Sequence, residues 1–115
     1  MSFRSWTDIR GHAAQIGVLR RICASAQPAH AYLFEGPDGV GKRVVAWALA
    51  ARLMCEAPDH ERGACGDCRS CHALLRGEHP DLTLVERDGA NIRIAQVRDA
   101  LKPLRFEPVL GRAKV

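Results

Sequence analysis

The fold class is decided by residues 31–43, AYLFEGPDGVGKR. Residues 31–34 are apolar without polar alternation, as expected for a strand that is buried on both faces. Residues 36–41 hold three glycines, which predict a loop. From Gly41 to about Met54 the sequence is apolar almost all round, which predicts a helix buried on most sides. A strand, a glycine-rich loop and a helix in this order favour an α/β protein with a parallel sheet.

Residues 36–42 also match the pattern G-x-x-x-x-G-K, which binds phosphate when it follows a strand and opens a helix. The glycines let successive backbone N–H groups point inward, and the helix N-terminus favours an anion. Lys42 would reach the β- and γ-phosphates of a nucleotide. The alternative is a glycine turn with a chance lysine, which the flanking strand and helix disfavour. We therefore expect nucleotide-binding contacts from Gly36, Pro37, Asp38, Gly39, Val40, Gly41, Lys42 and Arg43.

Arg43 departs from the phosphate-binding pattern, which has Ser or Thr at this position to place a hydroxyl on Mg²⁺. A guanidinium group has only hydrogen-bond donors and cannot ligate a cation. Hydrolysis also needs an acidic residue on a later strand to hold the metal and water, and we identify no such strand within the 115 residues. The sequence predicts no catalytic residue. ATP is the candidate ligand, Mg²⁺ is disfavoured, and any hydrolysis is expected to be weak.

Four of the five cysteines form a second pattern, and a structural Zn²⁺ site is its leading interpretation. Three of them are separated by two-residue gaps, which let adjacent thiolates converge on one tetrahedral ion. The expected ligands are Cys55, Cys65, Cys68 and Cys71. His60, His72 and His79 are alternative fourth ligands. Reduced cysteines packed as small apolar groups, or a redox C-x-x-C pair, are weaker alternatives.

The composition is that of a globular domain: 47% of the residues are hydrophobic, 26% are charged and the net charge is +4. The apolar run 44–51 is far shorter than the roughly 20 residues of a membrane helix. The start, residues 1–6, lacks the apolar core of a secretory signal, so we expect a cytoplasmic protein with no membrane partner.

The positive charge is unevenly distributed. Residues 1–54 carry seven basic and three acidic side chains, residues 55–86 carry three and seven, and residues 87–115 again carry seven and three. Phosphate affinity depends on basic residues. The acidic cysteine-containing segment is therefore not expected to be a nucleic-acid-binding zinc module.

The remaining elements follow from periodicity and breakers. Helices are expected at 12–26, where Cys23 lies on the apolar face, at about 71–75 and at about 94–101. A second strand is expected at 82–85, after the turn His79-Pro80-Asp81, and a further strand is expected to begin at 113–115.

Together with the lead-in HAYLFEGP at 30–37, the glycine-rich loop and the four cysteines resemble the N-terminal AAA+ module of bacterial clamp-loader subunits of DNA polymerase III. The resemblance extends from Trp6 to Val115. It implies a P-loop AAA+ parallel sheet with flanking helices, in which residues 55–71 form a Cys₄ zinc insertion. It also implies that Ile9 and Gly11, in the turn 9–12, line an adenine pocket.

In that family the magnesium-binding acidic strand would start after Val115. Residues 1–115 are therefore expected to be the N-terminal part of the nucleotide-binding domain, with later domains absent from this chain. The implied activity belongs to DNA replication, as part of a DNA polymerase III holoenzyme. The implied partners are the other clamp-loader subunits, gamma/tau and delta, and, through the assembled complex, the sliding clamp and primed DNA.

Two branches of the family differ at the loop. The gamma/tau branch hydrolyses ATP and keeps Ser or Thr after the loop lysine, whereas the delta-prime branch acts as a rigid stator. Arg43 and the turn at 79–81 favour the delta-prime branch. The alternative is a gamma/tau-type ATPase.

Overall fold

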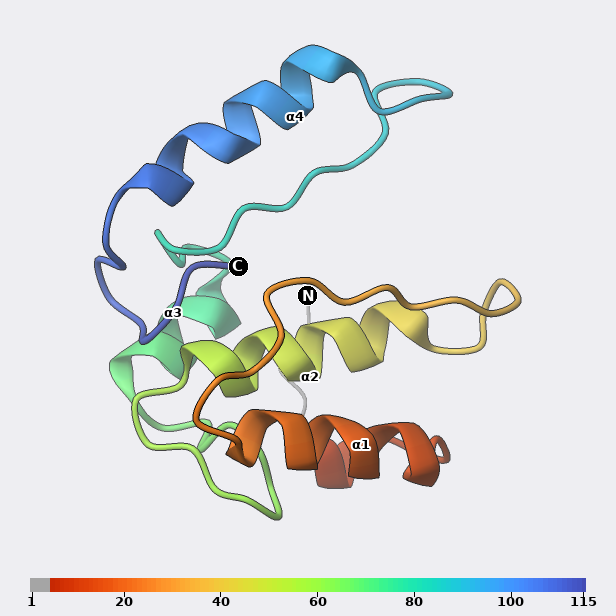
Figure 1. Ribbon diagram of the computed structural model, residues 1–115, viewed down its shortest axis with the longest axis vertical. Helices are drawn as coiled ribbons and strands as arrows, with labels where there is room; N and C mark the ends of the chain where they lie inside the picture. The colour runs from red at the N-terminus through yellow and green to blue at the C-terminus, as the bar shows by residue number, and fades with distance from the viewer. Residues whose placement is uncertain (1–4) are drawn as a thin grey trace.

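The computed structural model describes residues 5–115 (Figure 1). Residues 1–4, which contributed to the argument against a secretory signal, lie outside the described residues. The elements, in chain order, are η1 (Trp6–Asp8), α1 (Ala13–Ala24), α2 (Lys42–Met54), α3 (Arg69–Arg76), α4 (Ile94–Leu101) and η2 (Lys102–Arg105). All four predicted helices are confirmed, with ends that differ by two residues or fewer. No helix in the described part of the chain is long and apolar enough to cross a membrane.

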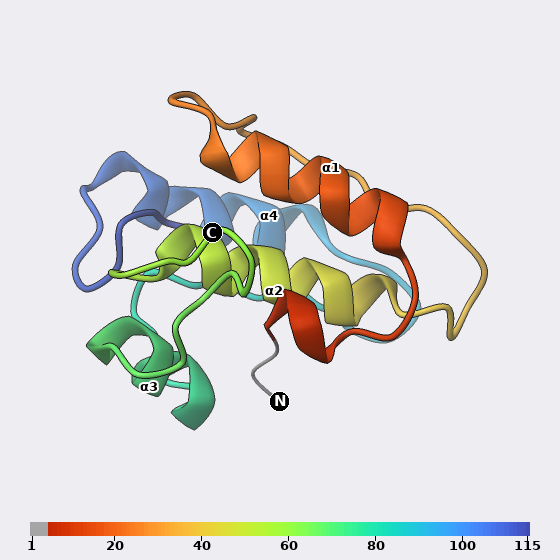
Figure 2. The same ribbon diagram turned by 90° about the horizontal axis from the view of Figure 1, so that it is seen from below.

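The first core forms where α1 packs on α2. Figure 2 shows these two helices side by side. Ile16, Leu19 and Cys23 of α1 repeat at helical spacing and are buried in this core. Cys23 is one of them, so its predicted core position is confirmed. The buried members of this core are Trp6, Ile16, Leu19, Cys23, Val45, Ala48 and Leu49.

Trp6 attaches the N-terminal turn to the segment that carries the cysteines. Its side chain is 2% exposed, and its backbone N–H donates to Arg62 O at 2.9 Å. Gly63 lies directly against the indole: a Cβ at Gly63 would be 2.8 Å from Trp6 Nε1. Gly63 also has φ +89°, which only glycine adopts without strain. Two separate constraints therefore require glycine at this position.

A second core lies between the C-terminal end of α2 and α3. Met54, Cys55 and Cys71 are fully buried there. Because α2 contributes to both cores, six of its thirteen residues are buried. This confirms the expectation of a helix that is covered on most sides.

The predicted parallel sheet is not found in the described part of the chain. Residues 31–36 and 82–87 have no regular secondary structure. A strand needs backbone hydrogen bonds to a neighbouring strand. For these two segments the described residues provide such bonds only around Leu82, where Val115 N donates to Asp81 O and Thr83 N donates to Val115 O, both at 2.9 Å. This is the bonding pattern of a parallel pair, and it involves the segment 113–115 that was expected to begin a strand.

The apolar side chains of these segments are not covered as a parallel sheet requires. Leu33 is 83% exposed and Leu84 is 54% exposed. The protein exposes 7931 Å², against about 6,200 Å² for a compact protein of this mass. The architecture is therefore open and helical.

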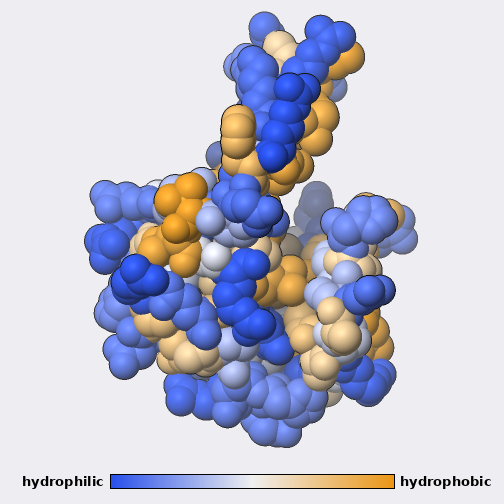
Figure 3. Space-filling view, turned by 60° about the vertical axis from the view of Figure 1, so that its left-hand side comes forward, coloured by the Kyte–Doolittle hydropathy of each residue, from blue (hydrophilic) through white to orange (hydrophobic). Residues whose placement is uncertain are grey.

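Helix α4 stands apart from the two cores (Figure 1). No residue of α4 is buried, and Ile94 and Leu101 are 68% and 56% exposed. In Figure 3 the part of the molecule that projects at the top carries both apolar and polar side chains on its surface. Sequence periodicity therefore predicted the α4 helix correctly, but its apolar side chains remain uncovered.

Candidate functional site

The glycine-rich loop, residues 36–41, leads directly into the N-terminus of α2. Gly41 is the residue before the helix and has φ +104°, a conformation that favours glycine. The first hydrogen bond of the helix type runs from Val45 N to Gly41 O at 3.1 Å. The N–H groups of the first turn before it have no acceptor within the helix. They add to the positive end of the helix dipole at this loop.

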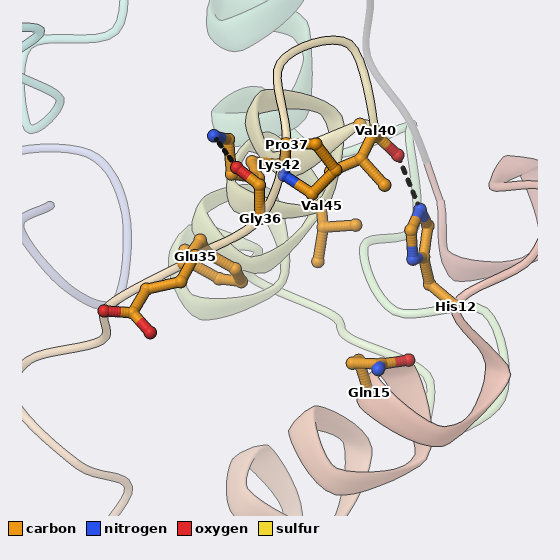
Figure 4. Close-up of a pocket in the computed structure, with 10 residues that line it drawn as sticks. His12, Gln15, Glu35, Gly36, Pro37, Val40, Lys42 and Val45 are labelled. Atoms are coloured by element: carbon orange, nitrogen blue, oxygen red, sulfur yellow. Dashed lines mark hydrogen bonds between the residues drawn. The ribbon is translucent and has the colours of Figure 1, made fainter.

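Lys42 points back into the loop, as Figure 4 shows. Its Nζ donates to Gly36 O at 2.6 Å. A hollow of about 190 Å³ lies beside it, lined by Phe34, Glu35, Gly36, Pro37, Val40, Gly41, Lys42 and Val45 together with His12 and Gln15 of the α1 end. The structure thus brings together five of the eight predicted loop residues. Asp38 and Gly39 lie exposed in the turn of the loop, and Arg43 is directed elsewhere.

His12 connects the turn at 9–12 to the glycine-rich loop. Its Nε2 donates to Val40 O at 2.7 Å (Figure 4). A second hollow of about 220 Å³ is lined by Asp8, Ile9, Arg10, His12, Val40, Gly41 and Val44. Ile9, expected in an adenine pocket, lines this second hollow. Gly11 lines neither of the two hollows described here and forms the turn, at φ +74°.

Sequence reasoning did not single out His12 as a site residue. It is the residue before α1 and has φ +59°, the one non-glycine positive φ in the described chain. The hydrogen bond to Val40 joins positions 28 residues apart. The only available signal was its position in the turn that the resemblance had associated with a base pocket.

Arg43 turns away from the loop and forms an ion pair with Glu86. The two side chains are 63% and 59% exposed. They line a third hollow, of about 490 Å³, with Val85, Arg87, Gly89 and Ile92. The position that holds a metal-binding hydroxyl in the phosphate-binding pattern therefore holds a cation that is already paired with a carboxylate.

The four predicted cysteines meet at the opposite end of α2. Their Sγ atoms all lie within 4.8 Å of one another. Cys55 and Cys68 are 3.9 Å apart at sulfur, and Cys65 and Cys71 are 4.0 Å apart. A tetrahedral Zn²⁺ with Zn–S bonds of about 2.3 Å has sulfur atoms about 3.8 Å apart. The cluster is thus close to the geometry of a four-thiolate metal centre.

Backbone N–H groups surround the sulfur atoms. Cys55 Sγ accepts from Ala57 N and Cys65 N, at 3.4 and 3.3 Å. Each of the other three sulfurs also accepts from a backbone N–H at 3.3–3.4 Å: Asp67 N donates to Cys65, Cys71 N to Cys68, and Gly66 N to Cys71. Such bonds favour a thiolate over a thiol. The donor set, four sulfurs that each accept a hydrogen bond, fits a metal ion.

The ionisation of the thiols is uneven without a metal. Burial opposes ionisation of Cys68, but the backbone N–H groups of Cys71 and Glu56 outweigh it and lower its pKa to about 7. Burial raises the pKa of Cys55 and of Cys71. Cys68 also precedes α3, where the helix dipole stabilises negative charge. A divalent cation would remove the cost of holding the other thiolates in the buried site.

His79, one of the alternative metal ligands, is used elsewhere. Its Nε2 is 2.7 Å from Ser70 Oγ, which donates to Met54 O at 2.8 Å. Its Nδ1 accepts from Asp81 N at 3.1 Å, so Nε2 carries the proton in the neutral ring. Burial lowers the pKa of His79.

The other two alternative ligands also lie outside the cluster. His60 is exposed, and His72 Nε2 lies 3.5 Å from Asp67 Oδ1. The cluster in the described chain therefore consists of the four cysteines.

One helix thus carries a phosphate-loop sequence motif at its N-terminus and a candidate four-cysteine metal centre at its C-terminus. This is the combination of features on which the resemblance to bacterial clamp-loader subunits rested. Residues 11–115 match the family described as "DNA polymerase III, delta subunit", and the chain belongs to this family.

The relatives include both branches that the sequence resembled. The chain is 46% identical over 92 residues to DNA polymerase III subunit delta' of Pseudomonas aeruginosa, covering 78% of this chain and 28% of that protein. It is 35% identical over 88 residues to the Escherichia coli subunit delta', covering 75% and 26%. It is 33% identical over 113 residues to subunit tau/gamma of Haemophilus influenzae, covering 97% and 16%. The chain therefore spans less than a third of the length of each of these relatives.

Proposed function

We propose that this chain is part of a delta-prime-type clamp-loader subunit that acts in DNA replication. The family match and the 46% identity to a subunit named delta' support this proposal. In this proposal residues 1–115 form the N-terminal part of an AAA+ nucleotide-binding domain, with residues 55–71 as its metal-binding insertion. The partners are the gamma/tau and delta subunits and, in the assembled complex, the sliding clamp and primed DNA. The location is the cytoplasm.

The glycine-rich loop is proposed to hold the phosphates of ATP. The observation that carries this proposal is the position of Lys42, whose ammonium group lies at the loop carbonyl of Gly36 beside a hollow. The ammonium group and the helix N-terminus both favour negative charge there. The second hollow, which Ile9 lines and which shares His12, Val40 and Gly41 with the first, is the proposed base pocket.

Hydrolysis by this site is proposed to be weak or absent. Arg43 cannot supply an oxygen ligand to Mg²⁺. Its pairing with Glu86 also occupies a carboxylate near the loop. A subunit with this loop would bind nucleotide as a structural element of a complex.

A gamma/tau-type ATPase is the second candidate. The observation that favours it is the length of the similarity, since the tau/gamma relative matches 97% of this chain. The loop is also complete in every position of the motif except position 43.

The four cysteines are proposed to bind one structural Zn²⁺. The ion would join the end of α2 to the start of α3, and its role would be to stabilise this junction. The acidic charge of residues 55–86 argues against a role in DNA contact.

The proposal is tested by ATP binding and Mg²⁺-dependent turnover of the protein and of two variants. We expect Lys42→Ala to weaken ATP binding by about tenfold or more, the scale of one charge-assisted hydrogen bond. We expect the unsubstituted protein to show no turnover above that of Lys42→Ala. Turnover that is lost in Lys42→Ala would refute the stator proposal. A large rise in turnover in Arg43→Thr would support the proposal over the ATPase alternative, because Arg43 would then be the residue that blocks hydrolysis in the native chain.

A further inference from the structure

Arg43 and Lys42 are adjacent cations with different partners. Lys42 donates to a carbonyl within the glycine-rich loop. Arg43, the second residue of α2, pairs with Glu86, which lies 43 positions later in the chain. Both side chains of this ion pair are more than half exposed, so the pair can open at small cost. Arg43 therefore has a partner that it can exchange.

Glu86 is held in place by the start of α4. Its backbone carbonyl accepts from Gln96 Nε2 at 2.8 Å, and Gln96 Oε1 accepts from Arg93 N at 2.8 Å. The carboxylate is thus presented to Arg43 by a second, separate part of the molecule. It competes with any anion that approaches the N-terminus of α2.

The guanidinium group of Arg43 cannot ligate a metal ion, unlike the Ser or Thr hydroxyl that the pattern has at this position. A Ser or Thr hydroxyl offers lone pairs to Mg²⁺, whereas Arg43 offers N–H donors that match phosphate oxygens in pairs. A fixed positive charge at this position repels a divalent cation and attracts a phosphate. One residue therefore changes both the ligand and the charge that the site prefers.

We infer that Arg43 takes the place of Mg²⁺ at the glycine-rich loop, so that the loop prefers a metal-free polyphosphate to its magnesium complex, and that Glu86 holds Arg43 while no anion is bound. This inference rests on the proposed function of the same loop. It goes beyond weak hydrolysis, because it assigns the site a preference for free ATP and assigns Glu86 a regulatory contact.

The test measures the binding of ATP and of inorganic tripolyphosphate by calorimetry, once with a chelator and once with excess Mg²⁺. For the unsubstituted protein we expect binding of both probes to be about tenfold tighter with the chelator. Arg43→Thr should lose or reverse this preference, and Arg43→Lys, which keeps the charge, should retain part of it. A change in magnesium dependence shows that Arg43 acts on the ligand directly. A variant that only disturbed the fold would weaken binding equally with the chelator and with Mg²⁺.

Glu86→Gln should tighten metal-free binding by about threefold, the scale of an exposed ion pair. The matched control is Glu78→Gln. Glu78 is also an exposed acid paired with an arginine, Arg76. It comes two residues after α3, the helix that Figure 1 shows at the other end of α2 from the glycine-rich loop. Equal effects of the two variants would refute the role of Glu86, because net charge alone would then explain them.

The outcomes separate this inference from the proposed function. If neither probe binds, or if Lys42→Ala binds as tightly as the unsubstituted protein, the phosphate site itself is refuted. If binding depends on Lys42 but requires Mg²⁺, the site stands and the replacement of Mg²⁺ by Arg43 is refuted.

Discussion

The carboxylate of Asp81 connects the turn after α3 to the segment near Val115, and replacing it tests how that connection is held. Its Oδ1 accepts from Val109 N at 2.7 Å, and its Oδ2 accepts from Leu110 N and Gly111 N, both at 2.8 Å. Asp81 is 3% exposed. Asp81→Asn keeps the size of the side chain but removes its charge and one acceptor oxygen.

The expected cost follows from those three bonds. If the amide oxygen replaces Oδ2, the bonds to Leu110 and Gly111 change from charged to neutral, and each loses about 1 kcal/mol. The amide NH₂ then faces the N–H of Val109, and the unsatisfied donor costs at least about 1 kcal/mol more. We expect Asp81→Asn to lower the free energy of unfolding by about 3 kcal/mol. For a domain of this length this corresponds to a decrease in Tm of about 12 °C.

The pH dependence gives a second measurement of the same group. Burial opposes ionisation of Asp81, but the backbone donors Val109, Gly111 and Leu110 outweigh it and lower the pKa below its ordinary value. A carboxylate whose pKa is lower in the folded state stabilises the protein above its unfolded pKa, about 3.9. This stabilisation is lost as the pH falls through the folded-state pKa. Asp81→Asn should therefore flatten the loss of stability below about pH 4.

The assay is thermal and urea unfolding followed by circular dichroism, at pH 7 and along a series to acid pH. The matched control is Asp99→Asn, because Asp99 is 72% exposed and pairs only with Lys102 in the contacts of α4 described by the structure. We expect Asp99→Asn to change the free energy of unfolding by less than about 0.5 kcal/mol. If the two variants differ by less than about 1 kcal/mol at pH 7, the reasoning from the three bonds is refuted.

Two further predictions concern the metal cluster and the contact with Trp6. Cys71→Ser should reduce bound zinc below half an equivalent, measured by elemental analysis. The control Cys23→Ala should keep one equivalent. If the unsubstituted protein itself holds under half an equivalent, the Cys₄ assignment is wrong. Acid should release the metal, because its ligands must be deprotonated. Gly63→Ala should lower the free energy of unfolding by about 3 kcal/mol through its positive φ and its clash with Trp6. Gly77→Ala, with a similar φ and no atom within 4 Å of the added Cβ, should cost only about 1 kcal/mol in the same melts, and equal costs would exclude the clash.

Much of the candidate site could be predicted because its signals are local in sequence. The loop residues from Gly36 to Lys42 are consecutive, and Gly41 before the apolar helix can adopt the positive φ that this turn requires. The two-residue gaps between Cys65, Cys68 and Cys71 place three thiols near one point. Even the choice of Cys55 over the histidines agreed with the structure, since it follows α2 directly.

The predicted sheet is not found in the described residues, and the reason is physical. An apolar run such as residues 31–34 specifies what a strand would bury, but a strand forms only when a partner supplies backbone bonds. In the described residues that partner is present for Leu82 alone, through Val115. The periodicity of residues 94–101 likewise predicted that they form a helix, but it could not predict which segments would pack against that helix. The apolar residues of α4 stay exposed.

The sequence by itself determined the four helices, the glycine-rich loop and the set of clustered cysteines, because helical periodicity, glycine turns and short thiol spacings act over a few residues. The tertiary structure decided the pairing of Arg43 with Glu86, the contact of His12 with Val40, and the binding of the 109–111 backbone by Asp81. Each of these joins groups at least 28 positions apart. The energies of such contacts depend on which distant segments meet in space, and no local pattern in the chain encodes that meeting.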